Sequence, residues 1–296
     1  MSRHTIVALG TLGASVLGGA CGSSLGTPTG QAPVPDPAGV TLSGHLVCGQ
    51  ADCLSAAAIR ARAEALHPLS PAALFTVALT PTGQLHFARN AAIDTCVVSL
   101  GGAPMIRDGA TPPDDFLDRL VLGGWQGVCA PGGGIDVVTT APASLVVAVV
   151  SDGSPLGTGL LQARAWTTRP RPVTALDLEE TRELRWAGGA MRARVGVERG
   201  NASLGLLFVG PAQDGLEHEH AGSWEIVGLL RGSGSTDVGA APGPPSTRGL
   251  RLQAGRVLAI PPGARHRSAT GASEEMFAVQ LYVPPGPEQR FKTLTE

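Results

Sequence analysis

The sequence is poor in lysine and carries no excess of positive charge. Lys292 is the only lysine, against 21 arginines, a skew that reflects coding bias more than function. The formal net charge is −2, so the chain lacks the basic footprint of nucleic-acid-binding proteins. Its cysteines show no C-x-x-C spacing, which argues against a zinc site built from thiolates. We therefore expect no nucleic-acid partner and no cysteine-ligated metal.

Glycine and proline are abundant, with 41 and 24 residues, and this favours turns and short strands over long helices. The 296 residues, 43% of them hydrophobic, suffice for one large or two modest domains. The Ala-rich segment Cys53–Leu66 predicts a short helix, which His67 and Pro68 end. From about Ala72 onward, short apolar runs predict strands: Ala73–Leu79, Cys96–Leu100, Ile135–Val138, Leu145–Val150, Met191–Val197, Leu204–Val209, Glu225–Leu230, Arg256–Ile260 and Met276–Val283.

The N-terminus has the features of an export signal. The apolar stretch Thr5–Ala20 is too short and too rich in glycine for a transmembrane helix. Leu17–Cys21 resembles a bacterial lipoprotein box, in which cleavage leaves Cys21 to be lipidated. An ordinary secretory signal and a plain apolar terminus are the alternatives. We expect a signal peptide over residues 1–21 and a flexible linker over residues 22–40.

An exported chain is expected in the cell envelope, held there by lipid, or in the periplasm or extracellular space. Its only membrane contact would be the lipid on Cys21. Four cysteines then remain, Cys48, Cys53, Cys96 and Cys129, and an even number fits two disulfides. Three connectivities are open, of which we favour Cys48–Cys53 and Cys96–Cys129. Four buried free thiols are the alternative.

Two parts of the chain can be aligned with each other. Leu85–Gly101 matches Leu216–Gly232, and Trp125–Val149 matches Gly255–Gln280 at a nearly equal offset. The Pro- and Arg-rich segment Thr167–Pro172 lies between them and predicts a domain boundary. Equal spacings at nearly equal offsets favour a duplicated fold.

Three of the seven histidines fall in two short patterns. Because residues i and i+2 of a strand face the same side, His218 and His220 are expected to point together. Glu225 follows after a turn, and His266 comes from a later strand. Three imidazoles and one carboxylate can ligate a divalent metal. The alternative is that the two neighbouring histidines are exposed loop residues.

These residues resemble the two motifs of the cupin superfamily. The first motif is H-x-H, three or four residues, Glu, six residues and Gly, and the second is G-x5-P-x-G-x2-H-x3-N. The matching residues are His218, His220, Glu225 and Gly232, followed by Gly255, Pro261, Gly263 and His266. Two positions depart from the pattern: the leading glycine of the first motif is missing, and Thr270 replaces the asparagine.

The resemblance implies an all-β fold of two tandem jelly-roll barrels with a short N-terminal helical segment, at residues 41–168 and 173–296. It implies one divalent transition metal (Mn, Fe, Ni, Cu or Zn) held by His218, His220, Glu225 and His266. The partner would be a small-molecule ligand or substrate. A homodimer is also implied, unless the duplicated chain satisfies that pairing within itself.

Two functions stay open at this point. One is a metal-dependent enzyme of the oxygenase, decarboxylase or isomerase type, thus an oxidoreductase or a lyase. The other is a non-enzymatic envelope lipoprotein that binds a metal or a small ligand. No residue stands out as the acid or base of a reaction.

The aligned positions in the first half are Phe87, Arg89, Asp94 and Asp136. Phe87 cannot ligate a metal, and Arg89 would place a fixed positive charge where the cation would sit. Arg89 is expected to pair with Asp94 or Asp136, or to bind an anion. We therefore expect a degenerate cupin domain that keeps the fold without the metal.

The surroundings of the motif residues carry further expectations. Glu219 and Arg265 should face away from the metal, because each is one residue from a ligand in an extended segment. Trp224 is expected to pack rather than to line the site. Arg231 and Arg251 are expected on the solvated surface, with steering of an anionic substrate as the alternative. Pro284–Phe291 is expected to form an extended arm after the last strand.

Overall fold

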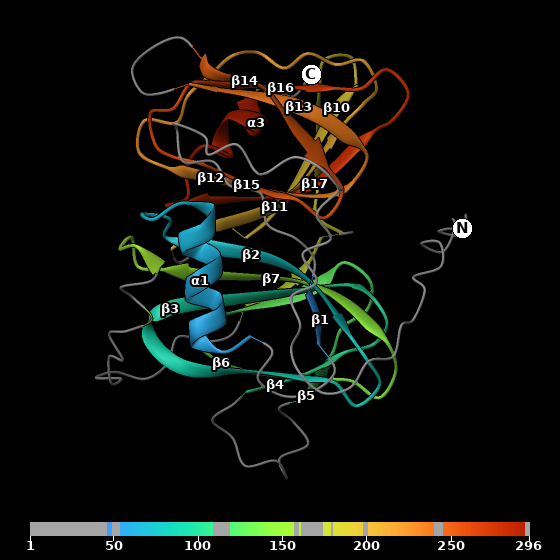
Figure 1. Cartoon of the computed structure of the whole chain (residues 1–296). Coiled ribbons are helices and arrows are strands. Elements are labelled where there is room, and N and C mark those ends of the chain that lie inside the picture. The colour runs from blue at the N-terminus through green and yellow to red at the C-terminus, as the bar shows by residue number, and fades with distance from the viewer. Residues whose placement is uncertain are drawn as a thin grey trace, which may run out of the picture.

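The computed structural model describes residues 46–48, 54–108, 119–156, 160, 174–178, 180–197, 201–239 and 245–293. The chain forms two β-rich halves stacked on each other, the N-terminal half in blue to green and the C-terminal half in yellow to red (Figure 1). This is the all-β fold that the sequence predicts. Cys21, the linker 22–40 and Cys53 lie outside the described residues, so the lipid anchor and the Cys48–Cys53 bridge stay predictions.

Each predicted strand lies within, or closely overlaps, an observed one. The N-terminal half contains β1 (Leu46–Cys48), α1 (Ala56–Leu66), β2 (Ala72–Leu79), β3 (Gln84–Gly101), β4 (Met105–Asp108), β5 (Arg119–Val121), β6 (Gln126–Val138) and β7 (Ala143–Ser151). The chain continues with β8 (Thr174–Asp177), β9 (Glu183–Trp186), β10 (Met191–Val197), β11 (Ser203–Val209), β12 (Trp224–Arg231), β13 (Ser233–Gly239), β14 (Pro245–Gln253), β15 (Val257–Ile260), β16 (His266–Thr270), β17 (Met276–Val283) and α3 (Gln289–Thr293).

The two halves pair their strands in the same order. Strands β6-β3-β7-β2 lie side by side in the N-terminal half, and β15-β12-β17-β11 do so in the C-terminal half. All these neighbours are antiparallel. In the N-terminal half β4 and β5 continue the sheet from β6, whereas in the C-terminal half β13 pairs with both β14 and β16 in a separate sheet. The C-terminal half therefore has two facing sheets, as in a jelly roll.

Strand β8 crosses from one half to the other. It pairs with β6, so that Asp177 lies opposite Gln126, whose amide donates to the Asp177 carboxylate at 3.0 Å. The start of the expected second domain thus belongs to the sheet of the first half. Residues 161–173 lie outside the described part of the chain, and the exact domain boundary stays a prediction.

Apolar packing joins the two halves across their facing sheets. The contact cluster includes residues of β2, β7, β12, β15 and β17, among them Leu74, Val146, Ile226, Val257 and Val279. Each of these is at most 3% exposed. Burial of one such side chain stabilises a fold by about 1.5–3 kcal/mol. The interface is therefore built like a protein core.

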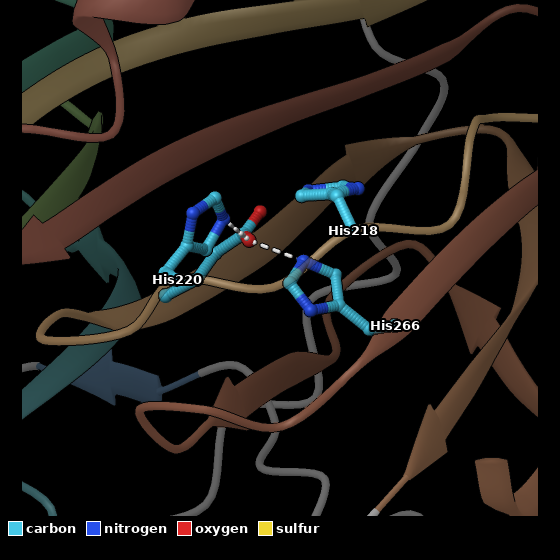
Figure 2. A group of neighbouring side chains, drawn as sticks. His218, His220 and His266 are labelled. Carbon is cyan, nitrogen blue, oxygen red and sulfur yellow. Dashed lines mark hydrogen bonds and ion pairs between the residues drawn. The ribbon is translucent and has the colours of Figure 1, made fainter. Parts of the chain in front are cut away.

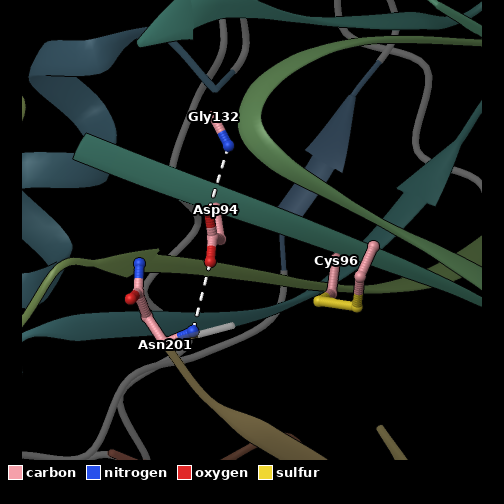
Figure 3. The surroundings of a disulfide bond; sticks show 5 residues. Asp94, Cys96, Gly132 and Asn201 are labelled. Carbon is pink, nitrogen blue, oxygen red and sulfur yellow. Dashed lines mark hydrogen bonds between the residues drawn. A yellow bond between two sulfur atoms is a disulfide. The ribbon is translucent and has the colours of Figure 1, made fainter. Parts of the chain in front are cut away.

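Polar and covalent links reinforce the N-terminal half at this interface. Cys96 of β3 and Cys129 of β6 lie opposite each other and form a disulfide, the pairing favoured from the sequence. Nearby, the Asp94 carboxylate accepts hydrogen bonds from the backbone N–H of Gly132 at 3.0 Å and of Asn201 at 3.3 Å (Figure 3). Because Asn201 lies two residues before β11, this carboxylate ties the two halves together.

Helix α1 packs beside the strands of both halves. The Ser55 side chain accepts a hydrogen bond from the Ala58 N–H and begins the helix, and His67 ends it before Pro68. The His67 ring meets the Trp224 ring edge-on, with 4.9 Å between centroids. Among the described residues no helix is long and apolar enough to span a bilayer.

The strand register corrects one of the aligned positions. Phe87 lies opposite Ile135 in the β3–β6 ladder, as His218 lies opposite His266 in the C-terminal half. Both apolar residues are buried. The counterpart of His266 is therefore Ile135 and not Asp136, because a shift of one residue in a strand reverses the face.

Arg89 does not lie in the interior of the first half, where the sequence analysis expected it. Arg89 is exposed, so it does not put a positive charge inside the sheet. The Asp136 carboxylate lies 2.6 Å from His86 Nδ1 on the outer face, and Asp94 binds the backbone N–H groups described above. The centre of this half is filled with apolar side chains instead.

Candidate metal centre

Two backbone segments pair to build the site. His218 and His266 form an isolated β-bridge, in which the N–H of His218 donates to the His266 carbonyl at 3.0 Å and the reverse bond is 2.8 Å. The Gly263 N–H donates to the His220 carbonyl at 2.8 Å. Gly263 has a φ of +73°, which glycine adopts without strain, so the turn after Pro261 can return the chain to this pairing. The two motifs are thereby held against each other.

Four side chains converge between these segments and β12. Glu225 Oε2 lies 2.9 Å from His220 Nε2 and 2.8 Å from His266 Nε2. The His218 ring centroid lies 4.1 Å from that of His266. One donor atom from each of the four residues lies within 4.8 Å of the other three. Figure 2 shows the three imidazole rings gathered around the carboxylate.

The orientation of two rings is fixed by the backbone. His218 Nδ1 lies 2.8 Å from the Leu216 carbonyl, and His266 Nδ1 lies 3.0 Å from the Ala264 carbonyl. A carbonyl only accepts, so each Nδ1 carries the hydrogen and leaves Nε2 with a free lone pair when the ring is neutral. Both Nε2 atoms are buried. Within the described structure the His218 Nε2 has no hydrogen-bond partner, whereas the His266 Nε2 faces Glu225 Oε2. Such second contacts are what orients histidine ligands in metal sites.

The charges in this cluster are strongly coupled. Burial alone would raise the pKa of Glu225, but the charge on His266 and hydrogen bonds from His220 and His266 hold that pKa well below its usual range. Burial alone would lower the pKa of His266, but the Glu225 carboxylate raises it above its ordinary 6.5. Burial, followed by the charges of His266 and Arg290, lowers the pKa of His218 to about 4. Without a metal, the Glu225 carboxylate thus favours the protonated form of His266.

Strand β17 adds two neighbours that the sequence analysis did not single out. The Gln280 amide donates to Glu225 Oε1, and the Tyr282 ring meets the His220 ring edge-on with 5.2 Å between centroids. Both side chains are buried, at 5% and 2% exposure. The sequence contains a signal for both. Gln280 and Tyr282 are two polar residues, two positions apart, in the otherwise apolar run Met276–Val283, so they face the same side of the strand.

The C-terminal segment differs from the expected extended arm. It ends in the short helix α3, whose Phe291 is buried and stacks on Trp186 of β9 at 5.0 Å. Figure 1 shows α3 between the two sheets of the C-terminal half. Arg290 of this helix acts electrostatically on His218 and His266, so it is a neighbour of the site that sequence reasoning missed.

The residues expected to face outward do so. Arg265 lies 3.4 Å from Glu217 and 3.5 Å from Glu219, and these side chains are between 40% and 52% exposed. Trp224 packs into the cluster between the two halves, as expected. Among the described residues, the candidate ligands are therefore His218, His220, Glu225 and His266, with the glutamate 5% and the last histidine 2% exposed.

The arrangement fits a metal ion. Ligand atoms that lie about 2.1 Å from a metal are within about 4.2 Å of one another. The donor atoms here lie within 4.8 Å of one another, so the largest distance between them would shorten by only about half an ångström. The unpartnered Nε2 of His218, aimed into the cluster, is a buried lone pair that a cation would satisfy. Three imidazoles and a carboxylate suit several transition metals.

Comparison with known proteins supports the fold. No family model and no curated protein matches the chain. Oxalate decarboxylase from Bacillus subtilis, in a study of its Mn(II) centres, matches with a TM-score of 0.57 and 12% identity over 76% of this chain and 72% of that one. The protein Ylba from E. coli matches with a TM-score of 0.52 and 10% identity, over 72% of this chain and 77% of that one. A protein from Pseudomonas aeruginosa described as a putative glyoxylate-induced protein matches with a TM-score of 0.53 and 9% identity, over 73% of this chain and 76% of that one.

Likeness at such low identity concerns the fold alone. These neighbours are cupin-type proteins. The chain has the all-β jelly-roll fold of cupin-type proteins.

Proposed function

We propose that the C-terminal half binds one divalent transition metal through His218, His220, Glu225 and His266. The observation that carries this proposal is the convergence of the four donors within 4.8 Å, with His218 Nε2 buried and unpartnered among them. Leaving such a group unpaired costs about 1–3 kcal/mol, which a bound cation would offset. Manganese is the first candidate, because Mn(II) centres are named for a neighbour of the same fold.

The proposed activity is that of a metal-dependent enzyme acting on a small organic molecule. A bound divalent metal supplies Lewis acidity to an oxygen-bearing substrate. The chain's own residues orient this centre: Gln280 holds the Glu225 carboxylate, and the Leu216 and Ala264 carbonyls hold two imidazoles. A lyase of the decarboxylase type is favoured among the options, since oxalate decarboxylases share the fold.

A binding role without turnover is the second candidate. The burial of His220, Glu225 and His266, each at most 8% exposed, favours it, because a closed site limits exchange of substrate. His218 is the most exposed of the four ligands and marks the side from which a ligand would enter.

Two wider proposals concern the whole chain. The shared strand order supports a duplicated cupin pair in which the N-terminal half has lost its ligands. The signal-like N-terminus supports export, with Cys21 lipidated and the protein in the cell envelope. In that location the disulfide Cys96–Cys129 would persist.

Elemental analysis of purified protein tests the metal site. The full chain should hold about one equivalent of metal, and the double variant His218→Ala with His266→Ala should hold none while keeping its circular dichroism spectrum. The variant His86→Ala is the matched control, because it removes a histidine that also contacts a carboxylate, Asp136, but on the outer face of the first half.

The control variant should retain the metal content of the wild type. Equal metal content in the double variant and the wild type would show that the four residues are not the site. If the wild type holds no metal and takes none up from excess Mn²⁺, Fe²⁺ or Zn²⁺, the proposed function is wrong.

A further inference from the structure

The C-terminal helix α3 and the turn before it form a small unit of their own. The backbone N–H groups at positions 289, 290 and 291 donate to the carbonyls at 286, 287 and 288, over 3.0, 3.2 and 3.1 Å. The Glu288 carboxylate accepts hydrogen bonds from the Gly286 N–H at 2.8 Å and from the Gln289 amide at 3.2 Å. These hydrogen bonds all lie within residues 286–293, so they can move together with the segment.

Phe291 is the main anchor of this segment on the barrel. It is 3% exposed, stacks on Trp186 of β9 and belongs to the same apolar cluster as Tyr282. Among residues 284–293, all of them described in the structure, it is the only buried apolar side chain. The Arg290 side chain also reaches Tyr282. A helix of five residues is not stable in water by itself, so these contacts with the barrel are what hold α3 in place.

A small cavity lies between α3 and the strands of the barrel, next to the candidate metal centre. Its volume is about 10 Å³, room for about one water molecule, and its walls include Gln280 and Tyr282 of β17 and Phe291 of α3. The Gln280 amide donates to Glu225, and the Tyr282 ring meets the His220 ring edge-on. Helix α3 is therefore one side chain away from two of the proposed ligands, and it closes the centre on this side.

Gly286 gives the segment a point about which it can turn. Its φ is +147°, in the region that glycine adopts readily, and a Cβ on it would meet nothing within 4 Å. It lies three residues after the end of β17 and three before α3. Hinges are commonly a few residues at the end of an element that absorb a change in backbone angles. A rotation here would move residues 287–293 without displacing a strand of the barrel.

We propose that α3 is a displaceable plug, which closes the metal centre on the side of Gln280 and Tyr282 and admits a ligand there when it swings out about Gly286. This inference rests on the proposed metal site and adds how that site opens. Figure 1 shows the position that the plug requires, with α3 inserted between the two sheets of the C-terminal half.

The plug reconciles a buried metal centre with the exchange of a ligand. His220, Glu225 and His266 are each at most 8% exposed, which limits exchange in the closed form. With Phe291 withdrawn, the space that its ring now fills joins the small cavity and forms a pocket beside the ligands. A minor open form of this kind is enough for a ligand to enter, because binding then shifts the population toward it.

The rate of metal release tests the plug. The full chain is loaded with Zn²⁺ and mixed with an excess of the coloured chelator pyridylazoresorcinol, whose absorbance reports the metal released. Phe291→Ala should speed release at least about tenfold, because the buried ring no longer favours the closed form. Gly286→Ala removes no contact, yet it should speed release at least about fivefold, because alanine is strained at this φ. Both variants should bind as much Zn²⁺ as the wild type.

Two control variants separate opening of the plug from a general loss of stability. Leu252→Ala truncates a side chain of β14 that is 3% exposed and lies in a cluster of the same half that does not include α3. Gly153→Ala places alanine at another glycine of positive φ, +101°, with open space around it, in the N-terminal half. Release from both controls should stay within about twofold of the wild type, because each site is independent of α3.

Hydrogen exchange followed by mass spectrometry tests the same motion without a metal. In the metal-free full chain, the amides of residues 289–291 should exchange at least about tenfold faster than those of β11 and β17, because α3 opens locally. Phe291→Ala should speed exchange in the helix further and leave the two strands unchanged.

The outcomes keep the two proposals apart. If metal is bound but Phe291→Ala and Gly286→Ala release it at the wild-type rate, or if Leu252→Ala speeds release as much as they do, the plug is wrong and the metal site stands. Protection of residues 289–291 equal to that of β11 and β17 would also overturn the plug. A wild type without bound metal would overturn the proposed function, and hydrogen exchange would then decide whether α3 is displaceable.

Discussion

The two halves of the chain order their strands alike but fill the corresponding positions in opposite ways. In the C-terminal half the bridge at the centre of the fold joins His218 to His266, and in the N-terminal half it joins Phe87 to Ile135. Phenylalanine and isoleucine satisfy a barrel interior by burial alone. Two imidazoles there need polar partners instead: His266 Nε2 faces Glu225, and His218 Nε2 has no partner among the described residues, a cost that a bound ligand would offset.

The halves also differ in what holds them rigid. The N-terminal half has a disulfide between adjacent strands and a buried carboxylate, Asp94, that binds backbone N–H groups. The C-terminal half contains no cysteine, and its buried carboxylate, Glu225, is surrounded by His220, His266 and Gln280. One buried acid thus supports the fold, whereas the other is arranged for a cation. The same strand order thus carries a purely apolar centre in one half and the proposed metal site in the other.

Removing the disulfide should produce the largest difference between the two halves, measured as a loss of stability in the N-terminal half alone. Cys96→Ala with Cys129→Ala should lower the free energy of unfolding of the N-terminal half by about 3–4 kcal/mol, because a cross-link between residues 33 apart no longer restrains the unfolded chain. Hydrogen exchange followed by mass spectrometry would assign the loss to each half. Metal content should be unchanged, and loss of metal would show that the two halves do not divide these roles.

The glycines that end the aligned segments should respond differently to the same substitution. A Cβ at Gly232, whose φ is +83°, would lie 2.3 Å from the Glu275 carbonyl oxygen, whereas a Cβ at Gly101 would meet nothing within 4 Å. Gly232→Ala should therefore cost about 2–3 kcal/mol of stability, through strain and a clash with backbone. Gly101→Ala should change stability by less than about 0.5 kcal/mol. Urea denaturation of both variants makes the comparison, and equal losses would refute it.

The affinity of the metal should depend on pH through His266. The raised pKa of His266 means that the metal-free protein holds a proton which the metal must displace. Affinity should therefore fall at least tenfold for each pH unit below that raised pKa, and His218, with a pKa of about 4, resists protonation until much lower pH. Competition with a chelator of known affinity, from pH 5 to 8, measures the slope.

The stability of the metal-free protein should move in the opposite direction above pH 6.5, whereas below 6.5 the lowered pKa of His218 makes that stability rise with pH. A histidine whose pKa is raised on folding contributes its stability below 6.5, and that contribution is lost as pH rises through the raised value. The gap in melting temperature between metal-loaded and metal-free protein should thus widen from pH 5 to pH 8. A gap that is constant over this range would contradict the pairing of His266 with Glu225.

The sequence predicted the strands from local spacing, and it identified candidate ligands that the structure brings together. His218 and His220 share a face through the two-residue period of extended chain, and Gly263 signals the turn before His266. Their convergence with Glu225 followed only from resemblance to a motif, since no local rule pairs residues this far apart.

What escaped prediction depended on tertiary contacts. The sequence alignment matched Asp136 to His266, which is one residue out of register. The observed pairing of Phe87 with Ile135 shows that Ile135 is the counterpart of His266. Helix α3 was taken for an extended arm, because five residues after a proline-rich stretch carry too little periodicity to identify a helix. Its Arg290 is brought to the site by the burial of Phe291 against Trp186, a contact that the sequence does not reveal.

Anomalous X-ray diffraction from crystals of the full chain grown with Mn²⁺ would test the division between the halves most directly. The account predicts one anomalous peak per chain, within ligand distance of His218, His220, Glu225 and His266, and none beside Phe87 and Ile135. A peak in the N-terminal half, or no peak in either half from protein saturated with the metal, would contradict it.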